Sequence, residues 1–204
     1  ANSIAGGEGS DSLYGMTGID TLLGGGGDDL LNVGDWDVTD DGEADVLQGG
    51  AGDDIYEVDA SDTVVEGLDD GIDTVRASSD YSLGDNVENL VFVDGVSHEG
   101  QGNALANVLT GAAGDDTLTG NDENDTLIGG LGADEYDGGS GTDTVSYASS
   151  TAAISVDLGT GVTSGGDAAG DTLTDVERLI GSAYGDTLSG GIGIVAFALH
   201  ADEV

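Results

Sequence analysis

Residues 102–146 decide the fold, and they read GNALANVLT, GAAGDDTLT, GNDENDTLI, GGLGADEYD and GGSGTDTVS, nonapeptides that follow one another without a gap. Residues 6–32 repeat the pattern as GGEGSDSLY, GMTGIDTLL and GGGGDDLLN. After an insertion at residues 33–39 the phase returns in residues 40–57, and one late unit, GSAYGDTLS, occupies residues 181–189. A fixed period of this length indicates a solenoid, in which each repeat packs only against its neighbours.

Most units begin with Gly, usually have Gly again at the fourth position, and carry Asp at the sixth and an apolar residue at the eighth. Gly permits the positive φ of a tight turn, and the Thr-Leu, Thr-Val or Val-Leu pairs after the Asp favour a short strand. Two units therefore predict one coil, whose strands stack in parallel on the next coil. The stack is expected to bury the eighth-position residues Leu13, Leu22, Leu31, Leu118, Leu127 and Val145.

The composition indicates that folding needs cations. The 204 residues include 42 acids against two arginines and no lysine, which gives a formal net charge of −40. Such a chain repels itself, and its charge excludes nucleic acid and anionic membranes as natural partners. With two Phe and one Trp, apolar burial alone is not expected to fold it. No Cys is present for a disulfide, and no apolar run predicts a transmembrane segment.

Stacking brings the sixth-position aspartates of alternate units to one edge, where like charges repel unless a cation lies between them. Carbonyl groups of the glycine-rich turns and an Asp from each of two stacked turns supply only oxygen, which suits calcium. Magnesium fits less well, because it requires a small octahedral site and retains its bound waters. Zinc is disfavoured because the chain has no Cys and its only histidines are His98 and His200. The alternative is that Asp and Gly merely form good turns in a metal-free β-helix.

These units resemble the RTX, or haemolysin-type, calcium-binding repeat. The resemblance implies an all-β fold, a right-handed parallel β-roll or β-helix solenoid with several Ca²⁺ ions in its turns. It also implies type I secretion to the bacterial surface or the extracellular medium. Asn107 and Val195 replace the Asp in their units, so binding is expected to fade there. Mapped onto the repeat, the side-chain ligands are Asp11, Asp20, Asp29, Asp45, Asp54, Asp116, Asp125, Asp134, Asp143 and Asp186.

The pattern predicts a first array at residues 1–57, connecting coils at 58–101, a second array at 102–146, further connecting coils at 147–180, and a last repeat with an apolar tail at 181–204. Residues 73–92 and 143–182 resemble linking segments of RTX-type proteins, and their alternation predicts strands that continue the solenoid. We expect His98 to be a solvated turn residue. The tail, residues 191–204, is expected to cap the roll, with an export signal or strand addition to another molecule as alternatives.

The sequence contains no Ser-His-Asp arrangement, HExxH motif or phosphate-binding loop, so we expect no enzymatic activity. Three functions stay open because the repeat is shared among different proteins. The first is a secreted or surface calcium-binding module with a structural or adhesive role, which folds on extracellular Ca²⁺. The second is an accessory module of a secreted polysaccharide-modifying enzyme or protease. The third is a self-assembling filament or surface-layer subunit. Besides calcium, the candidate partners are a second copy, end to end, and a polysaccharide or cell surface.

Overall fold

The computed structural model describes residues 1–34, 42–68, 70–190 and, by their backbone, 196–198. Most of the predicted insertion, the position of Val195 and most of the apolar tail lie outside these residues. The chain divides into two compact units, residues 1–93 and 94–204, and this boundary falls inside the predicted connecting segment 58–101. The described residues form strands and turns, with a single-turn 3₁₀-helix η1 (Gly166–Ala168) and no α-helix among them.

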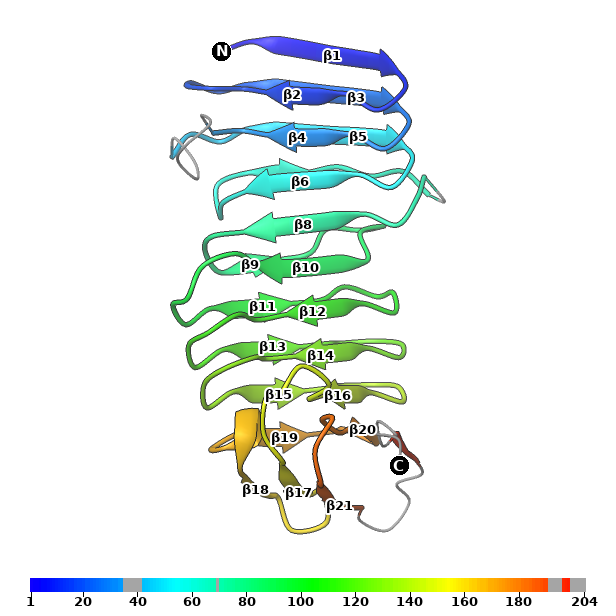
Figure 1. Ribbon diagram of the computed structural model, residues 1–204. Coiled ribbons are helices and arrows are strands. Elements are labelled where there is room, and N and C mark those ends of the chain that lie inside the picture. The colour runs from blue at the N-terminus through cyan, green and yellow to red at the C-terminus, as the bar shows by residue number, and fades with distance from the viewer. Residues whose placement is uncertain (35–41, 69, 191–195, 199–204) are drawn as a thin grey trace. The chain divides into compact units, whose positions relative to one another are not determined.

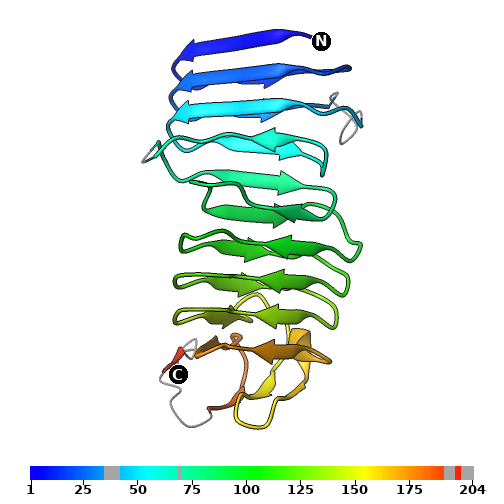
Figure 2. The same ribbon diagram turned by 180° about the vertical axis from the view of Figure 1, so that it is seen from behind.

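The first unit contains two parallel sheets whose strands alternate along the chain, so that two strands complete one coil. In one sheet the order is β1 (Ser3–Glu8), β3 (Thr21–Gly26), β5 (Val46–Ala51) and β7 (Thr63–Val64). In the other it is β2 (Ser12–Tyr14), β4 (Leu30–Asn32), β6 (Ile55–Val58), β8 (Thr74–Ala77) and β10 (Asn89–Phe92). The short β9 (Tyr81–Ser82) lies between β8 and β10 in sequence. Figures 1 and 2 show these strands stacked one above another from both sides.

The second unit continues the same alternation. One sheet has the order β11 (Glu99–Gln101), β13 (Thr117–Thr119), β15 (Glu135–Asp137) and β19 (Thr172–Thr174). The other has the order β12 (Val108–Thr110), β14 (Thr126–Ile128), β16 (Thr144–Ser146), β20 (Arg178–Ile180) and β22 (Ala196–Ala198). These pairings are parallel, which agrees with the expected parallel β-roll.

The register places eighth-position residues directly above one another. Leu13 is opposite Leu31 in the parallel pair β2–β4, and Leu127 is opposite Val145 in β14–β16. Alternate side chains of a strand face opposite sides, so the middle residue of most three-residue strands is the one that enters the core. The six predicted core residues are all buried, with exposed fractions between 0% and 4%, and the prediction is confirmed.

The turns account for glycine at the second and fourth positions of the repeat. Gly25 and Gly27 have φ values of 120° and 108°, a region that favours glycine. A Cβ on Gly25 would also collide with the carbonyl oxygen of Gly7 in the stacked coil. The unit at residues 120–128 lacks both glycines, yet Asn121 and Glu123 keep positive φ values of 82° and 70°. Stacking on neighbouring turns therefore holds this conformation even where the residue type does not favour it.

One segment departs from the expected solenoid. β17 (Ser155–Asp157) pairs antiparallel with β18 (Val162–Ser164) and parallel with β21 (Thr187–Ser189), and the three form a separate sheet. The expectation that residues 143–182 only continue the coils is wrong here, although β19 and β20 do continue them. The cause is a tight reversal in which Asp157 Oδ1 accepts the N–H of Gly159, and Gly161 adopts a φ of 71°.

Candidate metal centre

The sixth-position side chains form hydrogen-bonded ladders along the stacked coils. In one ladder of the second unit, Asn107 N donates to Asp125 Oδ1 at 2.7 Å, and Asp125 N donates to Asp143 Oδ1 at 2.8 Å. One carboxylate oxygen thus accepts the main-chain N–H of the sixth residue one coil earlier. Each carboxylate is fixed at the entry to a strand, and successive carboxylates are held in line.

Four such ladders run through the described residues, two in each unit. Those of the first unit connect Asn2, Asp20, Asp45 and Asp62, and Asp11, Asp29, Asp54, Asp73 and Glu88. Those of the second unit connect His98, Asp116, Asp134 and Asp171, and Asn107, Asp125, Asp143 and Glu177. Nine of the ten predicted ligands therefore lie on ladders, and only Asp186 does not.

The second carboxylate oxygen is the candidate metal ligand. It is buried and has no hydrogen-bond partner among the described residues in Asp11, Asp20, Asp29, Asp54, Asp73, Asp125 and Asp143. A buried oxygen of this kind is costly unless a proton or a cation compensates it. Two further predicted ligands differ, because Asp116 Oδ2 accepts the N–H of Ala112 at 3.2 Å and Asp134 Oδ2 contacts the Tyr136 hydroxyl at 3.4 Å.

Glycine at the first position of the repeat leaves space for two oxygens to converge. A Cβ built on Gly6 would lie 2.6 Å from Asp11 Oδ2 and 2.8 Å from the carbonyl oxygen of Gly24 in the next coil. The same collision with a carboxylate and a carbonyl oxygen recurs at Gly24, Gly102, Gly111 and Gly120, where in one case the amide of Asn107 supplies the side-chain oxygen. Carboxylate and carbonyl oxygens are the ligands that calcium prefers, so these residues fit the ion.

Burial sets the electrostatics of the ladders. It raises the pKa values of Asp54, Asp125 and Asp134 from 3.8 to about 6, and repulsion from a neighbouring carboxylate of the same ladder adds to the effect. The protein supplies little positive charge of its own. The two arginines include Arg76, whose Nη1 lies 2.6 Å from Glu57 Oε1 in a partly exposed ion pair. The stacked carboxylates therefore favour an external cation.

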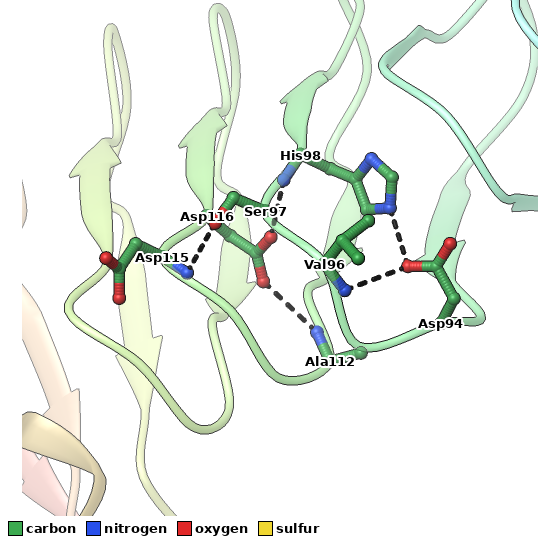
Figure 3. A network of polar contacts seen from close by, with 7 residues as sticks. All are labelled: Asp94, Val96, Ser97, His98, Ala112, Asp115 and Asp116. Carbon is green, nitrogen blue, oxygen red and sulfur yellow. Dashed lines mark hydrogen bonds and ion pairs between the residues drawn. The ribbon is translucent and has the colours of Figure 1, made fainter.

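His98 occupies a ladder position, as Figure 3 shows. Its main-chain N donates to Asp116 Oδ1 at 2.8 Å, as an Asp does in the other coils. Its ring Nε2 lies 2.8 Å from Asp94 Oδ1, which also accepts the N–H of Val96 at 3.1 Å and whose pKa is lowered by the His98 contact. His98 is 6% exposed, so the expected solvated side chain is wrong. Residues 93–101 occupy the place of one repeat unit but lack the Asp at the sixth position and the glycines at the first and fourth positions.

The sequence reasoning missed several ladder residues outside the nonapeptides. Asp62, Asp73 and Asp171 each begin an Asp-Thr-apolar triplet, the same triplet that enters many strands of the repeats. Glu88 and Glu177 both stand in the pattern Val-Glu-x-Leu, at positions 87–90 and 176–179. These two short patterns were available in the sequence and would have predicted the extension of the ladders.

The structure does not bring Asp186 together with the other predicted ligands. Its Oδ1 accepts the N–H of Ile154 at 2.9 Å and the hydroxyl of Ser182 at 2.7 Å. It precedes β21 in the separate sheet, so no stacked carboxylate of a ladder faces it among the described residues. Asn107 lies on a ladder, and the expectation that calcium binding fades there stays a prediction, whereas Val195 lies outside the described residues.

A family model of the RTX calcium-binding nonapeptide repeat matches the chain in four copies, at residues 5–35, 38–64, 101–136 and 110–145. Together these matches cover about half of the chain and include nine of the ten predicted ligands. The chain belongs to the RTX calcium-binding repeat family. Its RTX repeats form a calcium-binding module with the fold of a parallel β-roll. A search among curated proteins found no match. In the described part of this RTX chain, no helix is long and apolar enough to cross a membrane.

Proposed function

We propose that the chain is a secreted or surface-bound calcium-binding RTX module with a structural or adhesive role, which folds where extracellular calcium is available. Calcium is held between stacked turns by the Oδ2 atoms of the repeat aspartates on the ladders, with carbonyl oxygens of the glycine-rich turns as further ligands. The ligand set comprises the ladder residues Asp11, Asp20, Asp29, Asp45, Asp54, Asp116, Asp125, Asp134 and Asp143.

The observation that carries the proposal is the row of buried carboxylate oxygens that have no hydrogen-bond partner in the described part of the chain. Asp29, Asp54 and Asp125 are at most 3% exposed, so water does not solvate them well. Without a cation, each such oxygen opposes folding through desolvation and repulsion. A metal ion that binds only the folded chain supplies the missing free energy, and folding becomes conditional on the metal.

The test is a calcium titration of the purified chain, followed by far-UV circular dichroism and sedimentation. In EGTA the spectrum is expected to be coil-like, and millimolar calcium is expected to convert it to a β-rich spectrum. Magnesium at the same concentration is the control, because it fits an all-oxygen protein site less well. A spectrum that is equally β-rich in EGTA and in calcium would contradict metal-driven folding.

The same experiment addresses the alternative roles. Growth of long assemblies on calcium addition would favour a filament or surface-layer subunit, because strand edges at the ends of a solenoid can pair with another copy. Persistent monomers would favour a structural or adhesive module that does not assemble, or an accessory module attached to a secreted enzyme. We propose no catalytic activity for this chain itself, because its sequence contains no Ser-His-Asp arrangement, HExxH motif or phosphate-binding loop.

A further inference from the structure

Three buried carboxylates meet in the first unit, and two of them lie outside the nonapeptides. Asp54 enters β6, Glu66 follows β7, and Asp73 enters β8. Each offers one oxygen, and the three oxygens lie within 4.8 Å of one another. The exposed fractions of the three residues are 1%, 8% and 1%. The repeat pattern accounts for Asp54 alone, so the cluster depends on the connecting segment.

The hydrogen bonds leave part of this cluster uncompensated. Asp54 Oδ1 accepts the N–H of Asp29 at 2.7 Å, and Asp73 Oδ1 accepts the N–H of Asp54 at 2.9 Å. Glu66 Oε1 accepts the N–H of Gly49 at 3.0 Å, and its Oε2 accepts the N–H of Gly67 at 3.3 Å. Asp54 Oδ2 and Asp73 Oδ2 are buried and have no hydrogen-bond partner among the described residues. Two independent bare oxygens thus accompany the three converging carboxylates.

No basic side chain is available to neutralise the cluster. In the first unit the one basic residue is Arg76, which pairs with Glu57 on a partly exposed face. Burial raises the pKa values of all three carboxyls, that of Asp54 to about 6 and that of Asp73 to about 7. The protein therefore compensates this cluster with protons or with a metal ion.

We propose that Asp54, Glu66 and Asp73 form an additional calcium site, at which the connecting segment closes the first array. The site extends the proposed function, on which the choice of calcium rests. Two oxygens bound to calcium at about 2.4 Å lie at most about 4.8 Å apart, so the three carboxylates can share one ion. Three carboxylates and no Cys or His disfavour zinc, and magnesium would retain several waters that this buried cluster has little room for.

Glu66→Gln tests the site, because the amide oxygen of glutamine keeps the acceptor for Gly49 N and the charge is removed, while only the longer bond from Gly67 N is lost. The matched control is Asp62→Asn. Asp62 is also 8% exposed, and like Glu66 it accepts an N–H on each oxygen, from Asp45 and Asp59 at 3.0 Å, but it is not part of the three-carboxylate cluster. Equilibrium dialysis of the full chain against calcium is expected to give one bound ion fewer for E66Q and the wild-type number for D62N. A wild-type number and affinity for E66Q would overturn the proposal.

Tyrosine-sensitised terbium emission supplies a local readout. The Tyr56 hydroxyl accepts the same Gly49 N–H as Glu66, at 2.9 Å, so Tyr56 lies beside the proposed ion. Tyr56→Phe and E66Q are each expected to lower the emission of the terbium-loaded chain, and the double variant is expected to lose no more than the larger single loss. Additive losses would place the ion elsewhere and overturn the site.

The controls separate this proposal from the general one. Absence of calcium binding in the wild-type chain would refute the proposed function, whereas binding that E66Q leaves unchanged would refute the additional site alone. Circular dichroism in saturating calcium shows whether E66Q reaches the wild-type β content. If it does not, Asp73→Asn decides by the same ion count, because its amide oxygen keeps the ladder bond from Asp54 N.

Discussion

Replacement of Asp125 by Asn separates the two roles of a ladder carboxylate. Asp125 is 1% exposed, its Oδ1 accepts the N–H of Asn107 at 2.7 Å, and its Oδ2 is buried without a hydrogen-bond partner among the described residues. The amide keeps the acceptor and the volume but removes the charge. Asn107 already occupies the equivalent position one coil earlier, so the ladder accommodates an amide. The substitution therefore tests the charge and the metal ligand with little change in packing.

The expected magnitude follows from the pKa of Asp125. Burial, with repulsion from Asp143, Asp122 and Glu123, raises it from 3.8 to about 6. At pH 7.5 the ionised group lowers the stability of the metal-free fold by about 3 kcal/mol, because one pKa unit corresponds to about 1.4 kcal/mol. The Asn variant is therefore expected to be more stable than the wild type in EGTA, by up to about 3 kcal/mol.

Calcium is expected to reverse this ranking. A site contributes about 2.7 kcal/mol at a calcium concentration one hundred times its Kd, and about 4.1 kcal/mol at one thousand times. The Asn variant loses this contribution at one site. The two chains are therefore expected to have similar stability at the lower concentration, and the wild type is expected to be the more stable at the higher one.

The assay is folding followed by far-UV circular dichroism at pH 7.5. In EGTA, trimethylamine N-oxide drives the metal-free chain through its folding transition, and in calcium, urea drives unfolding. The D125N chain should need less of the osmolyte than the wild type. An equal calcium-induced gain in stability for both chains would refute the role of Asp125 as a ligand. An unchanged or lower stability in EGTA would refute the repulsion argument.

Three further predictions test the turns, the core and the protonation of the buried acids. Gly120→Ala places a Cβ against the carboxylate of Asp125 and the carbonyl oxygen of Gly138 in the stacked coil, and should cost about 1 to 3 kcal/mol and raise the calcium midpoint. Gly185→Ala, with nothing within 4 Å, should leave that midpoint unchanged. Leu127→Ala, at a fully buried position, should lower the free energy of unfolding in calcium by about 2 to 5 kcal/mol and should lower Tm. Val162→Ala, at a position that is 59% exposed, should change Tm little. In EGTA the folded fraction seen by circular dichroism should increase as the pH falls from about 8 to about 5. The pKa of Asp73 is about 7 in the folded chain and 3.8 when the group is not buried, so protonation favours the folded state, and this stabilisation is lost as the pH rises through the folded pKa. A flat profile would contradict this.

The nonapeptide spacing predicts the register of the coils because every unit has the same length. Leu13 and Leu31 are 18 residues apart and are opposite each other, as two units per coil require. The spacing also predicts the position of the Asp relative to each strand, so nine predicted ligands lie on ladders. It does not predict the hydrogen bond from one Asp N to the next Asp carboxylate, because that contact depends on how closely the coils approach.

The predictions fail where the local geometry depends on a single turn or on a degenerate coil. The reversal at Asp157 and Gly161 turns β18 back along β17, and an alternating apolar pattern is the same for a strand in a coil and a strand in a hairpin. His98 lies on a ladder although its coil has neither the Asp nor the glycines of the repeat. In both places the pattern of residue types is not enough to predict the structure, which depends on the conformation of the backbone.

The ladders themselves explain how coils of different length keep one register. The paired positions are 18 residues apart from Asp11 to Asp29, 25 apart from Asp29 to Asp54, across the seven-residue insertion, and 37 apart from Asp134 to Asp171, yet the N–H to carboxylate distance stays between 2.7 and 2.9 Å. Register is therefore fixed at the entry to each strand and not by coil length. Insertions between ladder positions are tolerated as long as a carboxylate or amide returns before the next strand, which is how Glu66 and Asp73 of a connecting segment can meet a repeat aspartate.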